Sequence, residues 1–247
     1  MKACLALAAL LACTLAAAGE FSVNPVRLEL GAAVRSGAIT VRNEGKQPLS
    51  FQLQAMEWTQ DAAGKDQYQA SGDLIFFPKI MTIAPGEEGV VRVGTRTPVV
   101  AAEKTYRLFI EELPGNTQAA AEGDPQITFL IKFGAPIFIT PLKPDDGLDM
   151  TELSLAKGEL TLAAKNNGNR HQVVQGIVLT GVDASGQPVY SMTLADRYLL
   201  AGAARSYTST IAAEQCARIA SLEVEYKTDK LVTKRRMAVT RAMCRTQ

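Results

Sequence analysis

Ile127-Thr-Phe-Leu-Ile-Lys-Phe-Gly-Ala-Pro-Ile-Phe-Ile-Thr-Pro141 is dense in Phe, Ile and Thr and carries no helix-capping pattern, which predicts a β-strand. Alternation places four large apolar side chains on one face of this strand, namely Ile127, Phe129, Ile131 and Phe133. Such a face has two interpretations. It is either part of the core of a β-sandwich, or the apolar face of an edge strand that is offered to another protein. The stretch alone leaves both open.

Short alternating segments, separated by turns at regular spacing, flank this stretch on both sides and predict an all-β sandwich fold. A segment that alternates from Phe21 to Leu30 predicts an edge strand, because Pro25 lacks a main-chain N–H. We expect Asp61–Gly72 to be a polar loop. The proline-rich connector after Pro141 predicts a domain boundary, with a first domain at 19–141 and a second, smaller sandwich at 142–247.

The N-terminus predicts export. Met1-Lys2 is followed by an apolar run to Ala18 that ends in small residues, which is typical of a secretory signal peptide at 1–18. The run is too short to span a membrane, and no other segment predicts stable membrane insertion. The alternative is a lipoprotein signal that ends at Cys13.

Charge and cysteine content limit the classes of partner. The chain has 26 Lys and Arg against 25 Asp and Glu, so composition predicts no nucleic-acid partner. Cys216 and Cys244 are the only cysteines outside the predicted signal peptide. In an oxidising compartment two such cysteines most simply form one disulfide, and the alternative is a pair of buried thiols.

The sequence does not predict an enzyme. His171 is the only histidine, it has no accompanying Gly-x-Ser-x-Gly turn, and a metal pair would need a second histidine. No glycine-rich loop precedes a helix, so we expect no phosphate-bound cofactor and no cofactor of another kind. The adjacent Glu111 and Glu112 lie on opposite faces of a strand, which argues against paired acid–base catalysis.

An ordered set of motifs resembles the periplasmic pilus chaperones of the chaperone/usher pathway. The motifs are Pro25-Val-Arg27, Val41-Arg-Asn43, Leu74-Ile-Phe-Phe-Pro78, Ala84-Pro-Gly86, Tyr106-Arg-Leu-Phe-Ile-Glu-Glu-Leu-Pro114, Phe133-Gly-Ala-Pro-Ile-Phe-Ile-Thr-Pro141, Asn166-Asn-Gly-Asn169 and Tyr198-Leu-Leu-Ala-Gly202. The resemblance covers nearly the whole chain after the signal peptide and is strongest between Leu74 and Pro141. The Gly-x-Pro-x-Phe pattern is similar to that of divergent branches of the family.

The resemblance implies two immunoglobulin-like sandwiches set at an angle around a cleft. It also implies a function in the periplasm without cofactor or ATP: the chaperone adds one of its strands to an incomplete pilin subunit and delivers the subunit to an outer-membrane usher. The donor residues of the family match Ile127, Phe129 and Ile131, and Phe133 continues the same face. The resemblance therefore favours the edge-strand interpretation.

Two further sets of site residues are implied by the resemblance. Arg27 matches an arginine that anchors the C-terminal carboxylate of the pilin, although Pro136 occupies the position of the family's second anchor, a lysine. Arg92 and Glu103 match an interdomain charge network. The alternatives are a solvated charge for Arg27 and an ordinary surface pair for Arg92 and Glu103.

The alternative function is a structural pilus or adhesin subunit. Such a subunit should have one sandwich and a free N-terminal extension that serves as a donor strand. This sequence instead predicts two sandwiches, and its first strand begins within a few residues of Gly19. We therefore expect a chaperone.

Overall fold

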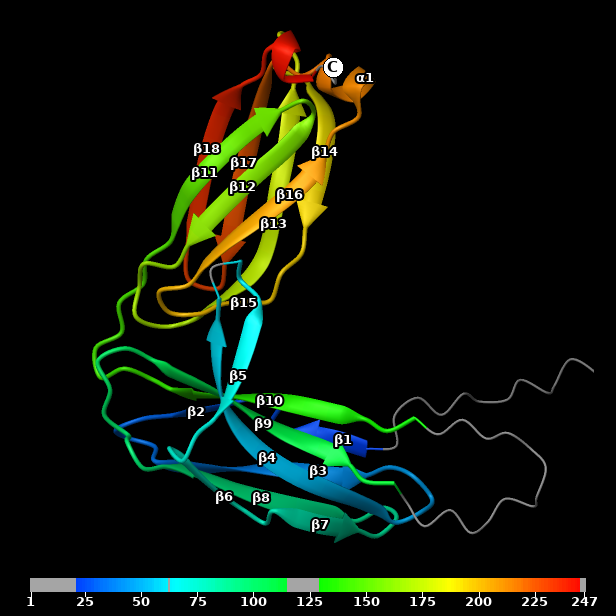
Figure 1. Cartoon of the computed structure of the whole chain (residues 1–247), viewed down its shortest axis with the longest axis vertical. Helices are drawn as coiled ribbons and strands as arrows, with labels where there is room; N and C mark the ends of the chain where they lie inside the picture. The colour runs from blue at the N-terminus through cyan, green and yellow to red at the C-terminus, as the bar shows by residue number, and fades with distance from the viewer. Residues whose placement is uncertain (1–20, 62, 115–128, 245–247) are drawn as a thin grey trace, which may run out of the picture.

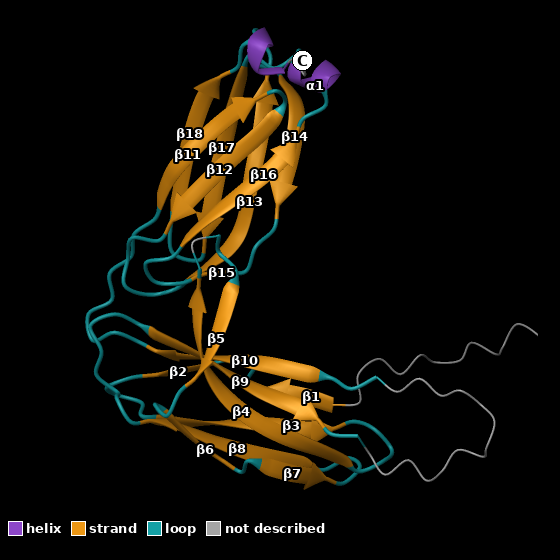
Figure 2. Ribbon diagram, viewed as in Figure 1, coloured by secondary structure: helices purple, strands orange, loops and turns teal. Residues whose placement is uncertain are grey.

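The computed structural model describes residues 21–61, 63–114 and 129–244. Within these ranges nearly every regular segment is a β-strand (Figure 2). Its helical segments are short and lie near the C-terminus, α1 (Ala213–Cys216) and η1 (Arg241–Cys244). The predicted all-β fold with two immunoglobulin-like sandwiches is confirmed, and the two sandwiches meet at an angle in Figure 1.

The first sandwich has two sheets. One has the strand order β1-β3-β8-β6, and the other has the order β2-β10-β9-β4-β5, with β7 paired to β4. The strands are β1 (Phe21–Asn24), β2 (Leu28–Leu30), β3 (Ser36–Asn43), β4 (Leu49–Gln60), β5 (Asp66–Ala70), β6 (Leu74–Phe77), β7 (Ile80–Ile83), β8 (Glu88–Thr95), β9 (Lys104–Glu112) and β10 (Lys132–Ile139).

Alternation of apolar side chains builds the core between these sheets. Val91 and Val93 of β8 face Phe51 of β4 and Leu108 and Ile110 of β9, and all five are buried. The opposite face of the larger sheet is directed toward the second sandwich. The first core therefore fixes which side chains of β4, β9 and β10 point toward the space between the domains.

The second sandwich has the sheets β11-β12-β16 and β14-β13-β17-β18, with β15 paired to β13. Its core is separate from the first and includes Leu162, Ile177, Leu222 and Tyr226. The strands are β11 (Asp149–Ala156), β12 (Glu159–Lys165), β13 (Gln172–Val182), β14 (Pro188–Leu194), β15 (Tyr198–Leu199), β16 (Ala204–Thr210), β17 (Ser221–Thr228) and β18 (Val232–Ala238).

The boundary after Pro141 stays a proposal that this arrangement supports. The last strand of the first sandwich ends at Ile139 and the first strand of the second begins at Asp149. The predicted signal peptide at 1–18 lies outside the described residues.

The expected single strand from Phe21 to Leu30 is two strands in different sheets. β1 pairs with β3, whereas β2 pairs with β10, because the chain crosses from one sheet to the other around Pro25. Each of the two is an edge strand, as the proline indicates. The apolar segment from Leu74 to Ile83 divides in the same way at Pro78, into β6 and β7.

The expected polar loop at Asp61–Gly72 is wrong. Its central part is β5, which pairs with the end of β4 from Met56 to Gln60 and forms a hairpin arm that extends toward the second sandwich (Figure 1). All five residues of β5 are exposed, so the segment has no alternation of apolar and polar side chains. Hydrophobic periodicity, the main sequence signal for a strand, is therefore missing here.

A disulfide joins Cys216 to Cys244 and ties α1 to η1 at the end of the second sandwich. Both cysteines are buried in the second core. Across residues 21–61, 63–114 and 129–244, no helix has the length and apolar character needed to cross a bilayer.

We expect the sequence separation of 28 between the two cysteines to determine how much this disulfide stabilises the fold. Cys216→Ala and Cys244→Ala should each lower the free energy of unfolding by about 3 kcal/mol, because the unfolded chain gains loop entropy. Urea unfolding of the oxidised protein measures this loss. The double variant should lose no more than the larger single loss plus a small packing difference, and fully additive losses would contradict the explanation.

Candidate functional site

The second half of the stretch Ile127–Pro141 belongs to the core. β10 begins at Lys132 rather than at Ile127, and Ala135, Ile137 and Ile139 are fully buried between the sheets. For this half, the core interpretation of the apolar face is correct.

The first half is exposed. The side chain of Phe129 is 84% exposed and that of Ile131 is 38% exposed, whereas Phe133 packs partly against the first core. Leu130, on the other face, is also exposed. Ile127 lies outside the described residues. The apolar face thus continues out of the core into solvent, as the donor hypothesis requires, and donation itself stays a prediction.

The main chain of β10 is open at the same end. β9 pairs with β10 from Lys132 to Ile139, but β2 covers its other edge only opposite Ile137–Ile139. In the described part of the chain, the outer edge of β10 before Ile137 has no strand beside it.

Hydrogen-bond alternation identifies the free groups on this edge. The N–H of Glu112 in β9 donates to the carbonyl of Ile131, at 2.9 Å. In an antiparallel ladder, the next residue along turns its main-chain groups to the other side. The N–H groups of Lys132 and Gly134 therefore point toward the open edge, and Pro136 has none.

A small apolar hollow lies beside the open edge. It has a volume of about 200 Å³ and is lined by Phe21, Val23, Val26, Ile131 and Phe133. These residues come from β1 and its following loop and from the start of β10, which are edges of the two opposed sheets. The sandwich is therefore open between its sheets where the apolar face becomes exposed.

Arg27 lies directly before β2, and strand register places it beside Pro136. β2 and β10 run parallel with Leu28 opposite Ile137, so Arg27 is next to Pro136. Its guanidinium contacts the carboxylate of Glu29 at 3.4 Å, and both side chains are nearly half exposed. Arg27 therefore remains accessible in the free protein.

Arg107 of β9 is a second cation at this level that the sequence did not predict. It pairs with Pro136 across the other edge of β10, and its side chain points away from the first core. Arginines on the two neighbouring strands thus flank the proline that replaces the family's lysine. Alternation with the core residues Tyr106 and Leu108 could have placed Arg107 on this face, but only strand register brings it next to Pro136.

The surroundings of Arg107 leave part of its hydrogen-bonding capacity unused. The guanidinium lies 4.0 Å from the centre of the Trp58 ring, 3.5 Å from a carboxylate oxygen of Asp66, and 3.3 Å from the carbonyl of Gly134. Its Nε is buried and has no hydrogen-bond partner among the described residues. A bidentate carboxylate is the ligand that a guanidinium edge fits best.

Of the two residues predicted for an interdomain charge network, Glu103 lies between the domains and Arg92 does not. Arg92 is exposed on β8, in the sheet that does not face the second sandwich, and it forms no ion pair within the described ranges. Glu103 is buried between the domains. The two residues lie on different sheets, so their order in the sequence does not bring them together.

Glu103 instead binds His171 of the second sandwich. Both carboxylate oxygens lie 2.9 Å from the His171 Nδ1, and one of them also accepts the main-chain N–H of His171 at 2.9 Å. The imidazole stacks on the ring of Phe138 of β10, with 3.7 Å between ring centres. His171 therefore takes part in the interdomain contact, which its sequence context, a turn, did not indicate.

Other charges surround this contact. The guanidinium of Arg170 bonds both carboxylate oxygens of Asp146, at 2.7 and 2.6 Å, which lowers the pKa of Asp146. Asp229 accepts the N–H of Val173 at 2.8 Å and pairs with Lys230. Charged side chains thus fix main-chain groups on the second-domain side of the joint.

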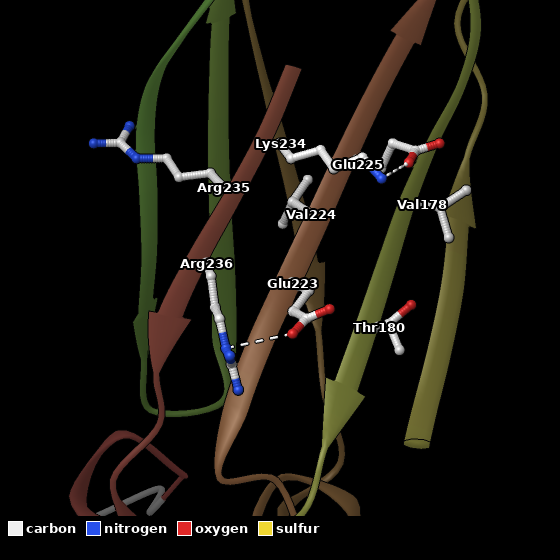
Figure 3. Close-up of a pocket in the computed structure, with 8 residues that line it drawn as sticks. All are labelled: Val178, Thr180, Glu223, Val224, Glu225, Lys234, Arg235 and Arg236. Atoms are coloured by element: carbon white, nitrogen blue, oxygen red, sulfur yellow. Dashed lines mark ion pairs between the residues drawn. The ribbon is translucent and has the colours of Figure 1, made fainter. Parts of the chain in front are cut away.

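A separate hollow of about 410 Å³ lies on the outer face of the second sandwich (Figure 3). Four of its five charged side chains form two ion pairs, Lys234 with Glu225 at 2.7 Å and Arg236 with Glu223 at 3.3 Å. In the part of the chain that the structure describes, no group of three or more His, Cys, Asp or Glu could hold a metal ion. This hollow therefore offers paired charges rather than a reactive constellation.

The buried Glu103–His171 contact makes a prediction about stability. Glu103→Ala should lower the free energy of unfolding by about 3 kcal/mol, because it leaves the buried groups of His171 without their partner. Glu111→Ala in β9, the strand that directly follows Glu103, removes an exposed carboxylate paired with Lys132 and should cost well under 1 kcal/mol. Urea unfolding measures both. Equal losses for the two variants would contradict the importance of the buried pair.

Comparisons with known proteins place this fold in a family. The chain resembles a chain of the CsuC–CsuE chaperone–tip adhesion subunit pre-assembly complex from archaic chaperone-usher Csu pili of Acinetobacter baumannii, with 18% identity over 87% of this chain and 98% of that chain, and a TM-score of 0.60. The YadV chaperone has 12% identity over 90% of this chain and all of that one, with a TM-score of 0.59. A chain of the SafA pilin–SafB chaperone complex of Salmonella enterica has 13% identity over 89% and 96%, with a TM-score of 0.57.

At these identities the likeness shows the shared fold. No curated protein matches the sequence. The family described as pili and flagellar-assembly chaperone, PapD N-terminal domain, matches residues 20–144, which is half of the chain and contains β1 to β10. This match does not favour the alternative of a structural subunit. The chain belongs to the family of pili and flagellar-assembly chaperones.

Proposed function

We propose that this chain is a periplasmic chaperone that holds a pilin subunit by adding the open edge of β10 to the subunit's incomplete sandwich. The observation that carries the proposal is the coincidence, at one end of β10, of main-chain N–H groups that have no strand beside them among the described residues and an apolar face that is 84% exposed at Phe129. The signal peptide predicted at 1–18 supports export to the periplasm.

The physical basis of capture is strand addition. A sandwich that lacks one strand exposes main-chain groups on two neighbouring edges and an apolar groove between its sheets. A donated strand satisfies those main-chain groups, and its alternate side chains fill the groove. Phe129, Ile131 and Phe133 stand about 7 Å apart on one face, as a groove of this kind requires. Full burial of a large apolar side chain contributes about 1.5 to 3 kcal/mol.

A cationic anchor sets the position of the client along the strand. We assign to Arg27 and Arg107 the binding of the client's C-terminal carboxylate, since they flank Pro136 from the two neighbouring strands. Two guanidinium groups can hold one carboxylate through charge-assisted hydrogen bonds. The Asp66 carboxylate, at 3.5 Å, is a weak internal partner that a client carboxylate can replace.

Pilin subunits are the partner class that fits this site. Solved chaperones of the same fold are described in complexes with a tip adhesion subunit and with a pilin. Handover of the client to an outer-membrane usher completes the proposed role. It needs no cofactor, because the free energy of folding that is not yet released in the complex remains available when one subunit strand replaces the chaperone strand.

The apolar donor side chains should be essential for binding. Phe129→Asp and Ile131→Asp should each weaken capture of a pilin subunit by 100-fold or more, about 3 kcal/mol, because a carboxylate would enter an apolar groove. Binding of purified chaperone to a refolding subunit measures the loss.

Val90→Asp is the matched control, because Val90 is also an exposed apolar residue but lies in β8, on the outer face of the other sheet. This variant should bind normally. Circular dichroism should show that all three variants are folded. Normal binding by both donor variants would mean that β10 is not the donor strand.

If the two arginines form this anchor, binding affinity should depend on the chemical group at the client's C-terminus. Arg27→Ala and Arg107→Ala should each weaken binding of a subunit with a free C-terminal carboxylate by about tenfold or more. Arg92→Ala, which removes an exposed arginine of the other sheet, should have no effect.

An amidated client separates charge binding from packing. If the two arginines hold the carboxylate, amidation should weaken wild-type binding, and Arg107→Ala should then add almost no further loss. A loss for Arg107→Ala that is the same with both clients would show that Arg107 only supports Trp58 and the fold.

A further inference from the structure

Two groups of polar contacts join the sandwiches, one at the connector and one at the β4–β5 hairpin arm, and the rings of Phe138, His171 and Tyr198 connect them. We infer that Gln60, near the tip of this arm, is a positioning residue that fixes the angle between the domains. The inference concerns the free protein and does not depend on the proposed client.

The first contact surrounds the interdomain connector. The side-chain amide of Asn169 donates to the carbonyls of Ala101 and Lys143, at 3.0 and 2.9 Å, and accepts the N–H of Asp145 at 2.8 Å. Its main-chain carbonyl accepts the N–H of Glu103 at 2.8 Å. The Glu103–His171 pair lies next to it. This contact alone would allow the two domains to turn about the connector, because all of its residues lie where the chain passes between the domains.

The second contact is made by the amide of Gln60. Its Oε1 accepts the N–H of Leu200 at 3.0 Å, and its Nε2 donates to the carbonyl of Tyr198 at 3.0 Å. One side chain thus binds the main chain of the second sandwich as a neighbouring strand would. Leu200 also packs against Trp58 and Phe138, so an apolar contact supports the polar one.

The tip of the arm adds steric contact. A Cβ on Gly64, whose φ is +76°, would lie 2.6 Å from Cγ of Arg205 in the second sandwich. The guanidinium of Arg205 is held by Asp196, at 3.0 Å, and Asp196 accepts a hydrogen bond from Tyr207 at 2.6 Å. The arm therefore rests on a side chain that is itself fixed within the second domain.

The positions of the two contacts explain their combined effect. In Figure 1 the connector passes along one side of the molecule, whereas the hairpin arm reaches the second sandwich at a different place. Rotation of the second sandwich about the connector would break the hydrogen bonds of Gln60, so the arm opposes that rotation. Domains joined by a single small contact usually move relative to each other. Here the arm removes that freedom.

The experiment compares two variants, each with a matched control. Gln60→Ala removes the amide, and Gln52→Ala removes an exposed glutamine from the same face of β4 outside the joint. Gly64→Ala pushes the tip away from Arg205. Gly86→Ala introduces a Cβ at the same φ of +76° with no atom within 4 Å. Small-angle X-ray scattering of the full chain after signal removal reports the domain angle, and amide exchange reports the Leu200 N–H.

We expect Gln60→Ala and Gly64→Ala to broaden the distribution of domain orientations needed to fit the scattering. Exchange of the Leu200 N–H should become about fivefold faster or more in Gln60→Ala, because its acceptor is lost. Gln52→Ala and Gly86→Ala should match the wild type in scattering. If both arm variants also keep the wild-type scattering profile, the arm does not set the angle and the inference is wrong.

Discussion

The arrangement of the site depends on unequal pairing along one strand. At its C-terminal end β10 lies between β9 and β2, and its alternate side chains Ala135, Ile137 and Ile139 are buried in the first core. Toward its N-terminal end it keeps β9 but has no described neighbour on the other side. A strand that is fixed at one end and unpaired at the other can offer its edge without loss of its own fold.

The same strand also forms part of the joint between the domains. Phe138 turns away from the first core and stacks on His171 of the second sandwich, while its neighbours Ile137 and Ile139 fill the first core. Packing around β10 therefore fixes the positions of the open edge, of Arg27 and Arg107, and of the domain contact relative to one another. The proposed client site and the domain contact are thus linked by direct packing around one strand.

Structural features that depend on local periodicity could be predicted from the sequence. The all-β fold, the turns and the exposed apolar face at Phe129 and Ile131 follow from alternation, from prolines and from resemblance to a family. Contacts set by tertiary register were not predictable in this way. The pairing of Glu103 with His171 and the position of Arg107 beside Pro136 join segments far apart in the chain. β5 was missed because an exposed arm needs no apolar periodicity.

Amide hydrogen exchange at the two outward N–H groups of β10 tests strand donation most directly. In the free protein the Lys132 and Gly134 amides should exchange quickly, since they point toward the open edge, while the Phe133 amide should be slow because it faces β9. A bound pilin subunit should slow Lys132 and Gly134 strongly and leave Phe133 nearly unchanged. A stable complex in which these two amides still exchange at their free rates would contradict donation through this edge.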